Sequence, residues 1–304
     1  MNNASKLVVL RRLRHAAAAC ALVTIAGCAS NGSADEHASH DSAAAGSPAA
    51  VQEPGLPADA AGARARLDAS PRHGEYQMIR TSNGDSVRAF IVYPERSTKA
   101  PVVLVVHEIF GLTTWVRAVA DQLAAEGFIA IAPDLLTSKN LPTDSTGDPV
   151  QSAATSAIRT LDRNVIHAQL RDIASWGMNL PAATKRYGIV GFCWGGGASI
   201  DHAMSAPDLD ASVIYYGSPG LTSYDAIRAP VLGLYGGSDA RVNATIPATD
   251  SIMKSLGKTY EPHIFDGAGH GFARQQTGQN GANAAAIRQA WPLTVAWFRK
   301  YLES

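Results

Sequence analysis

A cysteine stands at the centre of a glycine-rich turn in the segment YGIVGFCWGGG, residues 187–197. An apolar run leads into Gly191, Cys193 and Gly195, and small residues follow as a helix would begin. A turn that holds its central residue at the tip of a strand leaves almost no room for side chains two positions before and after it. The pattern predicts a nucleophile elbow with Cys193 as the nucleophile. A buried structural cysteine beside a glycine-rich helix start is the alternative interpretation.

Two later segments supply the groups that a thiol nucleophile needs. A free thiol has a pKa of about 8.5 and requires a base or a cation beside it to react as thiolate. Asp239 follows two glycines at the end of an apolar run, and His270 lies in the segment DGAGHGF after the next apolar run. The order nucleophile, acid, base predicts a Cys193–Asp239–His270 triad. Asp266 competes with Asp239 for the acid role, and Asp239 and His270 could each be ordinary loop residues.

The apolar run that ends at Val106 continues into HEIFGL, residues 107–112. A loop in this position supplies one backbone N–H to a developing oxyanion. We assign that role to Ile109, with the N–H of Trp194 as the second donor. Glu108 stands at the end of a buried strand, where its charge needs a partner. That partner could be the thiol or an arginine, or Glu108 could be a structural acid bonded to loop amides.

The elements that must position these residues alternate along the chain. Apolar strand-like runs occupy residues 86–93, 100–106, 128–132, 187–192, 211–216, 231–235 and 261–265, and helical spacing marks residues 116–126, 165–176 and 284–301. Fully apolar strands separated by helices are typical of a mainly parallel sheet covered by helices on both faces. The sequence therefore predicts an α/β domain over residues 71–304.

The motifs HEIFGL, GFCWGG and GHGFAR resemble those of the dienelactone hydrolase family, over roughly residues 75–304. The resemblance implies an α/β-hydrolase fold and a carboxymethylenebutenolidase-like Cys-Asp-His enzyme that opens small esters or lactones, carboxylate-bearing ones among them. It also implies that Glu108 accepts the thiol proton when substrate enters and that Arg274 binds a substrate carboxylate. A second such arginine is expected between Glu108 and Cys193, and Arg159 and Arg163 both fit. The chemistry is acyl transfer, which needs no metal or organic cofactor.

The N-terminal segment has the pattern of an export signal. A basic stretch precedes an uncharged run, residues 16–26, that is too short to span a bilayer. The run ends in IAGC at Cys28, which resembles the lipobox of bacterial lipoproteins, and an ordinary cleaved signal peptide is the alternative. We expect a signal over residues 1–28 with lipidation of Cys28 and a flexible tether over residues 29–70. The protein would then be lipid-anchored in the bacterial cell envelope or secreted to the periplasm.

Composition and charge argue against several other classes of function. Basic and acidic residues number 26 each, so nothing favours a nucleic-acid partner. The three cysteines offer no disulfide framework, and a redox switch would lack a resolving thiol in the mature domain. Two further functions stay open: a promiscuous carboxylesterase or thioesterase, and a non-catalytic membrane-tethered protein on a hydrolase scaffold.

The sequence also gives an expectation for the protonation of Cys193. A negative charge on Glu108 near the sulfur would raise the pKa of the thiol and keep it protonated at rest.

Overall fold

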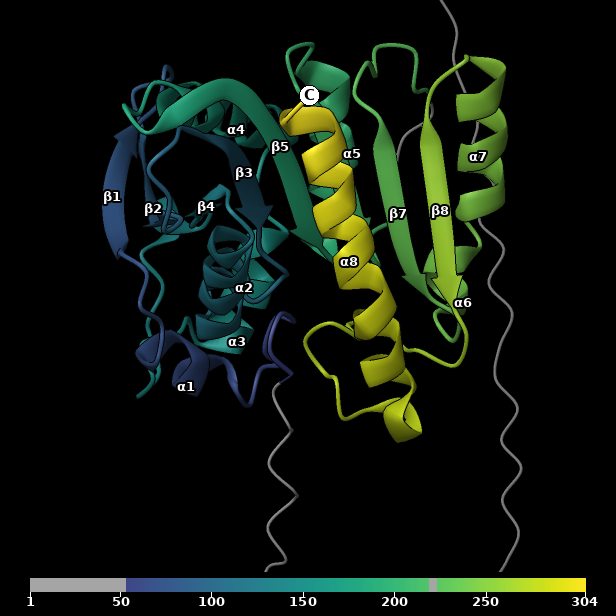
Figure 1. Ribbon diagram of the computed structural model, residues 1–304, viewed down its shortest axis with the longest axis horizontal. Helices are drawn as coiled ribbons and strands as arrows, with labels where there is room; N and C mark the ends of the chain where they lie inside the picture. The colour runs from purple at the N-terminus through teal and green to yellow at the C-terminus, as the bar shows by residue number, and fades with distance from the viewer. Residues whose placement is uncertain (1–52, 219–222) are drawn as a thin grey trace, which may run out of the picture. The chain divides into compact units, whose positions relative to one another are not determined.

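The central feature of the computed structural model, which describes residues 53–218 and 223–304, is one eight-stranded sheet (Figure 1). The strand order is β1-β2-β4-β3-β5-β6-β7-β8. β2 pairs antiparallel with β1 and with β4, and the remaining neighbours are parallel. The strands are β1 (Gly74–Arg80), β2 (Ser86–Val92), β3 (Ala100–Val106), β4 (Ile129–Pro133), β5 (Ala183–Phe192), β6 (Ala211–Tyr215), β7 (Val231–Gly236) and β8 (Tyr260–Phe265).

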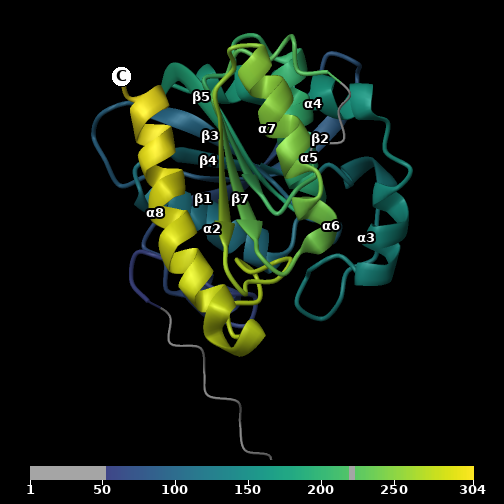
Figure 2. The same cartoon turned by 90° about the vertical axis from the view of Figure 1, so that its right-hand side faces the viewer.

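Helices cover both faces of this sheet (Figures 1 and 2). Apolar residues of α2 and α8 join one core cluster, and those of α4, α5 and α7 join the cluster on the other face. This arrangement confirms the predicted α/β fold. The helices are α1 (Ala63–Asp68), α2 (Thr114–Ala125), α3 (Gln151–Ile158), α4 (Arg163–Met178), α5 (Trp194–Ser205), α6 (Ala240–Asn243), α7 (Ile246–Ser255) and α8 (Ala282–Leu302), with short 3₁₀ turns η1 (Thr137–Lys139) and η2 (Gln279–Gly281).

Strand β3 shows why the central strands read as unbroken apolar runs. Successive side chains of a strand point to opposite faces of the sheet. Val103 and Val105 therefore enter the cluster formed with α2 and α8, and Val102 and Leu104 enter the opposite one. All seven residues of β3 are buried, because helices lie on both sides of it.

The parallel strands bring the predicted site residues to one edge of the sheet. The carboxyl ends of parallel strands lie at the same edge, and the loops that follow them meet there. Glu108 follows β3, Cys193 follows β5, Asp239 follows β7 and His270 follows β8. The topology alone thus gathers four separated segments around one place.

The structure differs from the predicted tether over its last residues. The stretch 53–70 packs on the domain and contains α1, whose Ala63 is fully buried. The Trp115 indole N–H donates to the Ala58 carbonyl over 3.0 Å, and the Ala60 N–H donates to the carbonyl of residue 274 over 2.9 Å. Short alanine- and proline-rich segments lack the periodicity that marks a helix, and contacts from other segments fix this one in place. Cys28 and the rest of the predicted signal and tether lie outside the described residues.

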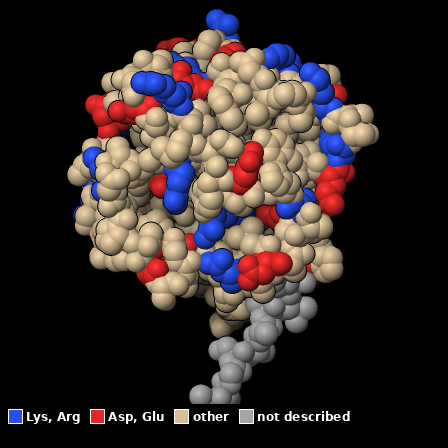
Figure 3. All heavy atoms as spheres, turned by 90° about the vertical axis from the view of Figure 1, so that its left-hand side faces the viewer, with Lys and Arg blue, Asp and Glu red and all other residues tan. Residues whose placement is uncertain are grey.

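The surface at the β1 edge of the sheet carries charges of both signs. Figure 3 shows basic and acidic side chains interspersed among uncharged ones on this face, as the balanced composition leads one to expect. Within residues 53–218 and 223–304, no helix is both long and apolar enough to cross a bilayer.

Candidate active site

Cys193 lies in the sharp turn between β5 and α5, as the glycine pattern predicts. Its backbone has φ 55° and ψ −114°, a conformation that residues other than glycine rarely adopt. A Cβ atom on Gly191 would lie 1.9 Å from the carbonyl oxygen of Gly195. A Cβ atom on Gly195 would lie 2.4 Å from the carbonyl oxygen of Val106. Both neighbours must therefore be glycine, and the strained turn presents the thiol at the edge of the sheet.

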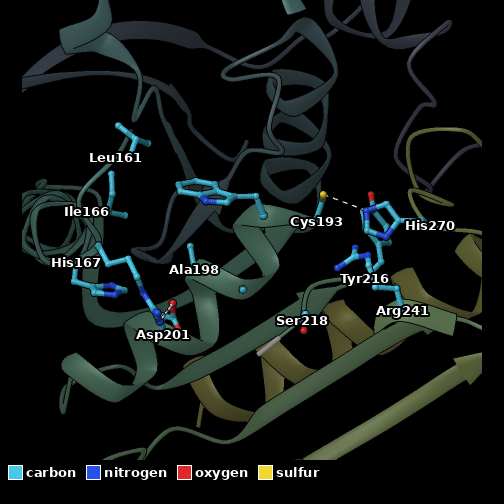
Figure 4. Close-up of a pocket in the computed structure, with 13 residues that line it drawn as sticks. Leu161, Ile166, His167, Cys193, Ala198, Asp201, Tyr216, Ser218, Arg241 and His270 are labelled. Carbon is cyan, nitrogen blue, oxygen red and sulfur yellow. Dashed lines mark hydrogen bonds and ion pairs between the residues drawn. The ribbon is translucent and has the colours of Figure 1, made fainter. Parts of the chain in front are cut away.

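The structure brings the three predicted triad side chains into contact. His270 Nε2 lies 3.1 Å from Cys193 Sγ (Figure 4), and His270 Nδ1 lies 2.5 Å from Asp239 Oδ2. Asp239 is 8 % exposed and also accepts a hydrogen bond from the N–H of Val242 at the start of α6. Asp266, its rival in the sequence, is exposed, and the structure pairs the histidine with Asp239 instead. The arrangement can relay a proton between sulfur and imidazole while the carboxylate orients the ring.

The thiol is protonated at rest. Burial raises the pKa of Cys193 to about 11, and the nearby charge of Glu108 adds to the effect against a hydrogen bond from the Trp194 N–H. The Asp239 carboxylate can only accept, so His270 Nδ1 carries the proton that it donates to Asp239. In the neutral ring Nε2 is then unprotonated, and the S–H group can donate to it. The direction agrees with the protonated thiol expected from the sequence. A thiol in this state can act as a nucleophile only after its proton has moved to a base, and the imidazole is the base in contact with it.

Glu108 is paired with Arg274 in the resting site. The carboxylate is 3 % exposed, and its Oε2 lies 2.7 Å from Arg274 Nε. Burial raises the pKa of Glu108 to about 7, although the Arg274 charge opposes that rise. The Arg274 guanidinium also lies over the Phe110 ring, 4.9 Å from its centroid. An arginine is thus the partner that the buried acid required, and Arg274 is already engaged before any substrate binds.

The raised pKa of Glu108 predicts how stability changes with pH. The folded protein holds a proton on Glu108 up to about pH 7, whereas the unfolded chain loses it near the ordinary glutamate pKa of 4.5. The contribution of Glu108 to stability is therefore fully present below pH 4.5 and declines as pH rises toward 7, by about 3 kcal/mol. We expect the unfolding free energy of Glu108→Gln minus that of the wild type to rise by this amount across the window, as measured by urea denaturation at each pH.

Only the change with pH of this difference in unfolding free energy tests the raised pKa of Glu108; its absolute value does not. Losing the partner of Arg274 adds an offset that does not depend on pH. Burial lowers the pKa of His167 to about 4 and of His202 to about 3, so both favour stability as pH rises, but equally in the two proteins. Stability curves that run parallel between pH 4.5 and 7 would contradict the raised pKa.

The two predicted oxyanion donors come from the loop after β3 and from the turn that carries Cys193. Trp194 is the first residue of α5, and its N–H contacts the sulfur at rest. Ile109 follows β3, whose end meets the start of α5 at the Gly195 contact described above. Among the described residues the Ile109 N–H has no hydrogen-bond partner, so it is available to a ligand. Acyl transfer requires two backbone donors near the nucleophile, and the Ile109 N–H and the Trp194 N–H are the candidates.

Known proteins share this sequence pattern and this architecture. The model of the dienelactone hydrolase family matches residues 87–302, more than half of the chain. The chain belongs to the dienelactone hydrolase family. A Salmonella typhimurium protein provisionally named carboxymethylenebutenolidase is 33% identical over 233 residues, covering 72% of this chain and 85% of its own length. Protein usf of Aquifex pyrophilus is 31% identical, covering 74% and 99%.

Solved structures of dienelactone hydrolases have the same fold. A Klebsiella pneumoniae structure provisionally named dienelactone hydrolase matches with a TM-score of 0.65 and 27% identity, covering 76% of this chain and 99% of that chain. The dienelactone hydrolase of Anabaena variabilis matches with a TM-score of 0.57 and 22% identity, over the same shares. Membership of the dienelactone hydrolase family makes this chain a hydrolase.

In this dienelactone hydrolase family member a cavity of about 400 Å³ opens beside the sulfur (Figure 4). This volume lies within the usual range for small-molecule sites. The cavity follows α5 away from Cys193, has a mainly apolar wall and ends at charged side chains. Its lining residues are Leu161, Arg163, Ile166, His167, Cys193, Trp194, Gly197, Ala198, Asp201, Tyr216, Ser218, Arg241 and His270.

The arginines of the cavity differ from those expected by family resemblance. Arg274 does not line the cavity, because Glu108 holds it. Arg163 lines it but forms an ion pair with Asp201, and Arg159 is exposed outside it.

Arg241 is the cation that the sequence analysis missed. It lies on α6, two residues after Asp239, it is exposed and it lines the cavity close to His270 (Figure 4). No ion pair of Arg241 occurs among the described residues. A basic residue two positions after the triad acid was the available signal, because the loop that aims the acid at the histidine also carries its neighbours toward the cavity.

Proposed function

We propose that the protein hydrolyses ester or lactone bonds, as a carboxymethylenebutenolidase-like enzyme, through a Cys193–His270–Asp239 triad. The observation that carries this proposal is the unbroken series of contacts from the Asp239 carboxylate through the imidazole to the sulfur, at 2.5 and 3.1 Å. Both the sulfur and the imidazole line the cavity. The relatives that bear the name carboxymethylenebutenolidase support the substrate class.

The first half of the reaction forms a thioester. As the ester carbonyl approaches, the thiol proton moves to His270 Nε2 and the sulfur attacks the carbonyl carbon. The N–H groups of Ile109 and Trp194 stabilise the oxyanion that develops. The tetrahedral intermediate collapses with cleavage of the ester C–O bond, and the imidazolium gives its proton to the leaving oxygen. In a lactone the leaving alcohol stays attached to the acyl group.

The second half returns the thiol. Neutral His270 takes a proton from water, which attacks the thioester carbonyl. The intermediate collapses with cleavage of the C–S bond, and the imidazolium returns its proton to the sulfur. Asp239 holds the Nδ1–H throughout and stabilises the imidazolium that forms twice in each cycle. The products are a carboxylic acid and an alcohol, joined as a hydroxy acid when the substrate is a lactone.

Glu108 and Arg274 act as a buried pair behind the thiol in this proposal. Glu108 has a pKa of about 7, so its protonation changes near neutral pH. The positive charge of Arg274 stabilises the buried carboxylate when it is ionised. If a substrate carboxylate draws Arg274 away, Glu108 becomes the alternative acceptor of the thiol proton. The family resemblance gives Glu108 the role of accepting the thiol proton. In the resting site Arg274 occupies its carboxylate, so this role requires that Arg274 first moves away.

Mass spectrometry tests the covalent step directly. The intact chain is mixed with a p-nitrophenyl ester and quenched in acid, and the peptide that contains Cys193 is expected to gain the mass of the acyl group. Label on another residue would contradict the proposal. So would full turnover by a protein that lacks the thiol.

A neutral-ester hydrolase is the second candidate, and the cavity itself favours it. Leu161, Ile166 and Trp194 give an apolar wall, and Arg163 is neutralised by Asp201. Arg241 remains as the unpaired cation of the lining, within the residues that the structure describes. The choice between carboxylate-bearing and neutral substrates thus depends on Arg241.

We expect Arg241→Gln to discriminate between these substrates. A charge-assisted hydrogen bond to a carboxylate contributes about 1.5–3 kcal/mol, so KM for an anionic lactone should rise by about tenfold or more. KM for p-nitrophenyl acetate should change little. Steady-state kinetics with both substrates measures the ratio.

Arg159→Gln is the matched control, because that arginine is exposed and lies outside the cavity. An Arg241→Gln enzyme with unaltered kinetics on both substrates would favour the neutral-ester hydrolase. Equal losses on both substrates would show instead that Arg241 acts on the thiol or the imidazole.

We propose, further, that the mature enzyme resides in a bacterial cell envelope, attached through a lipid on Cys28. The basic stretch, the short apolar run and the IAGC segment support this location. Metabolic labelling with a fatty acid should mark the wild-type protein, and an unlabelled protein released with the periplasmic fraction would indicate a secreted enzyme.

A further inference from the structure

His107 is fully buried at the end of β3, and both of its ring nitrogens bond to the backbone. Nδ1 lies 2.7 Å from the carbonyl oxygen of Glu108, and Nε2 lies 3.2 Å from the amide nitrogen of Leu135. A carbonyl can only accept and an amide N–H can only donate. Nδ1 therefore carries the proton and Nε2 does not. Burial lowers the pKa of His107, which keeps the ring neutral in this one tautomer.

The bond from Nδ1 fixes the orientation of the Glu108–Ile109 peptide group. The Glu108 carbonyl also accepts from the N–H of Gly111 over 3.3 Å. In a planar trans peptide the C=O and the following N–H point in opposite directions. Two donors on the Glu108 oxygen consequently direct the Ile109 N–H away from them. This N–H is one of the two donors assigned to the oxyanion.

The same imidazole touches the residue that carries the other donor. Its ring stacks on the indole of Trp194, with centroids 5.7 Å apart and planes inclined by 17°. Trp194 follows Cys193 and begins α5, so its side chain and its N–H belong to the turn that presents the thiol. His107 itself does not line the cavity and cannot reach the substrate.

We propose that His107 is a positioning residue that holds both halves of the oxyanion hole. Its Nδ1–H orients the peptide that ends in the Ile109 N–H, and its ring face supports Trp194. This inference rests on the proposed esterase function, because an oxyanion hole has a role only if an acyl group is transferred. The alternative is that His107 only satisfies the Leu135 amide, which is a contribution to stability.

The test compares His107→Phe with His107→Gln. Phenylalanine keeps a ring for the stack but removes both hydrogen bonds, and glutamine offers an amide that can donate and accept. We expect kcat for p-nitrophenyl acetate to fall by about 10- to 100-fold in the Phe variant with KM little changed, since complete removal of one oxyanion donor costs about 100- to 1,000-fold and a misaligned donor costs less. The Gln variant should recover to within a few-fold of the wild type.

Alkylation of Cys193 by iodoacetamide separates positioning from a general disturbance of the site. Alkylation forms no oxyanion, so its rate should be unchanged in the Phe variant while ester turnover falls. His202→Phe is the matched control, because His202 is equally buried but bonds to the Tyr187 hydroxyl away from the elbow. It should lower thermal stability without lowering kcat.

Several results would overturn the inference. These are an unchanged kcat in a folded Phe variant, an equal loss of turnover and alkylation, or a Gln variant as slow as Phe. If the Phe variant does not fold, His107→Leu carries the same expectation, because it removes both bonds in a smaller volume. Ester turnover that survives Cys193→Ala would instead refute the proposed function. Failure of the proposed function is thereby distinguished from failure of the inference about His107.

Discussion

Cys193→Ala is expected to lower kcat for ester hydrolysis by at least about 10⁴-fold, since a triad without its nucleophile retains only oxyanion and binding effects. In the proposed mechanism the sulfur forms the acyl intermediate, and positions 191 and 195 have no room for a side chain that could replace it. Initial rates with p-nitrophenyl acetate measure the loss. The fold should be retained, because alanine fits the volume of a side chain that is not fully buried.

Cys193→Ser sharpens the interpretation of that loss. His270 can still remove the hydroxyl proton, so we expect this variant to keep measurable activity above that of the alanine variant. Circular dichroism and thermal melting serve as the folding controls. If the ester hydrolysis rate of Cys193→Ala lies within tenfold of the wild-type rate, the sulfur has no part in the mechanism. That result would favour a non-catalytic protein on a hydrolase scaffold.

Asp239→Asn is expected to lower kcat by about 10³- to 10⁴-fold, in line with the same change in a serine triad. The Asp239 carboxylate lies 2.5 Å from His270 Nδ1 and holds the proton on that nitrogen. An amide that presents its NH₂ group would place the proton on Nε2, where the imidazole could no longer accept from the thiol. The pH profile of kcat/KM measures the change, because the imidazolium would also lose its stabilising charge.

Stability offers a control within the same variant. The Asp239 side chain accepts a hydrogen bond from the N–H of Val242, and asparagine caps helices about as well as aspartate. The variant should therefore melt close to the wild-type temperature while it loses activity. Asp266→Asn is the matched substitution at an exposed position, and we expect it to keep full activity. A reversal of these two results would return the acid role to Asp266.

The nucleophile turn could be predicted from sequence because its requirements are local. Gly191 and Gly195 are demanded by atoms within a few residues of Cys193 and by the adjoining strand end. Apolar runs of strand length likewise reveal strands that are buried on both faces, and the observed β3 has the predicted bounds. Elements with weaker patterns, α3 and α7 among them, were not predicted, because a few buried residues on an otherwise polar helix give little periodicity.

The partners of charged residues were not predictable in the same way. The sequence predicted Asp239 as the acid but could not exclude Asp266, and it left two candidates for a second substrate-binding arginine. The structure pairs His270 with Asp239, and it places Arg159 outside the cavity and Arg163 in an ion pair. Which charges meet depends on how loops from distant strands approach one another, and sequence separation carries no information about that distance.

The sequence by itself determined the family, the α/β fold and the chemical type of the proposed nucleophile, because steric demands at glycines and the alternation of buried strands are written in neighbouring residues. Only the tertiary structure decided that Arg274 pairs with Glu108, that Arg241 faces the cavity and that His107 contacts the Glu108 carbonyl and the Trp194 indole. The physical reason is that a buried charge or polar group is satisfied by whatever the fold brings within a few ångströms of it.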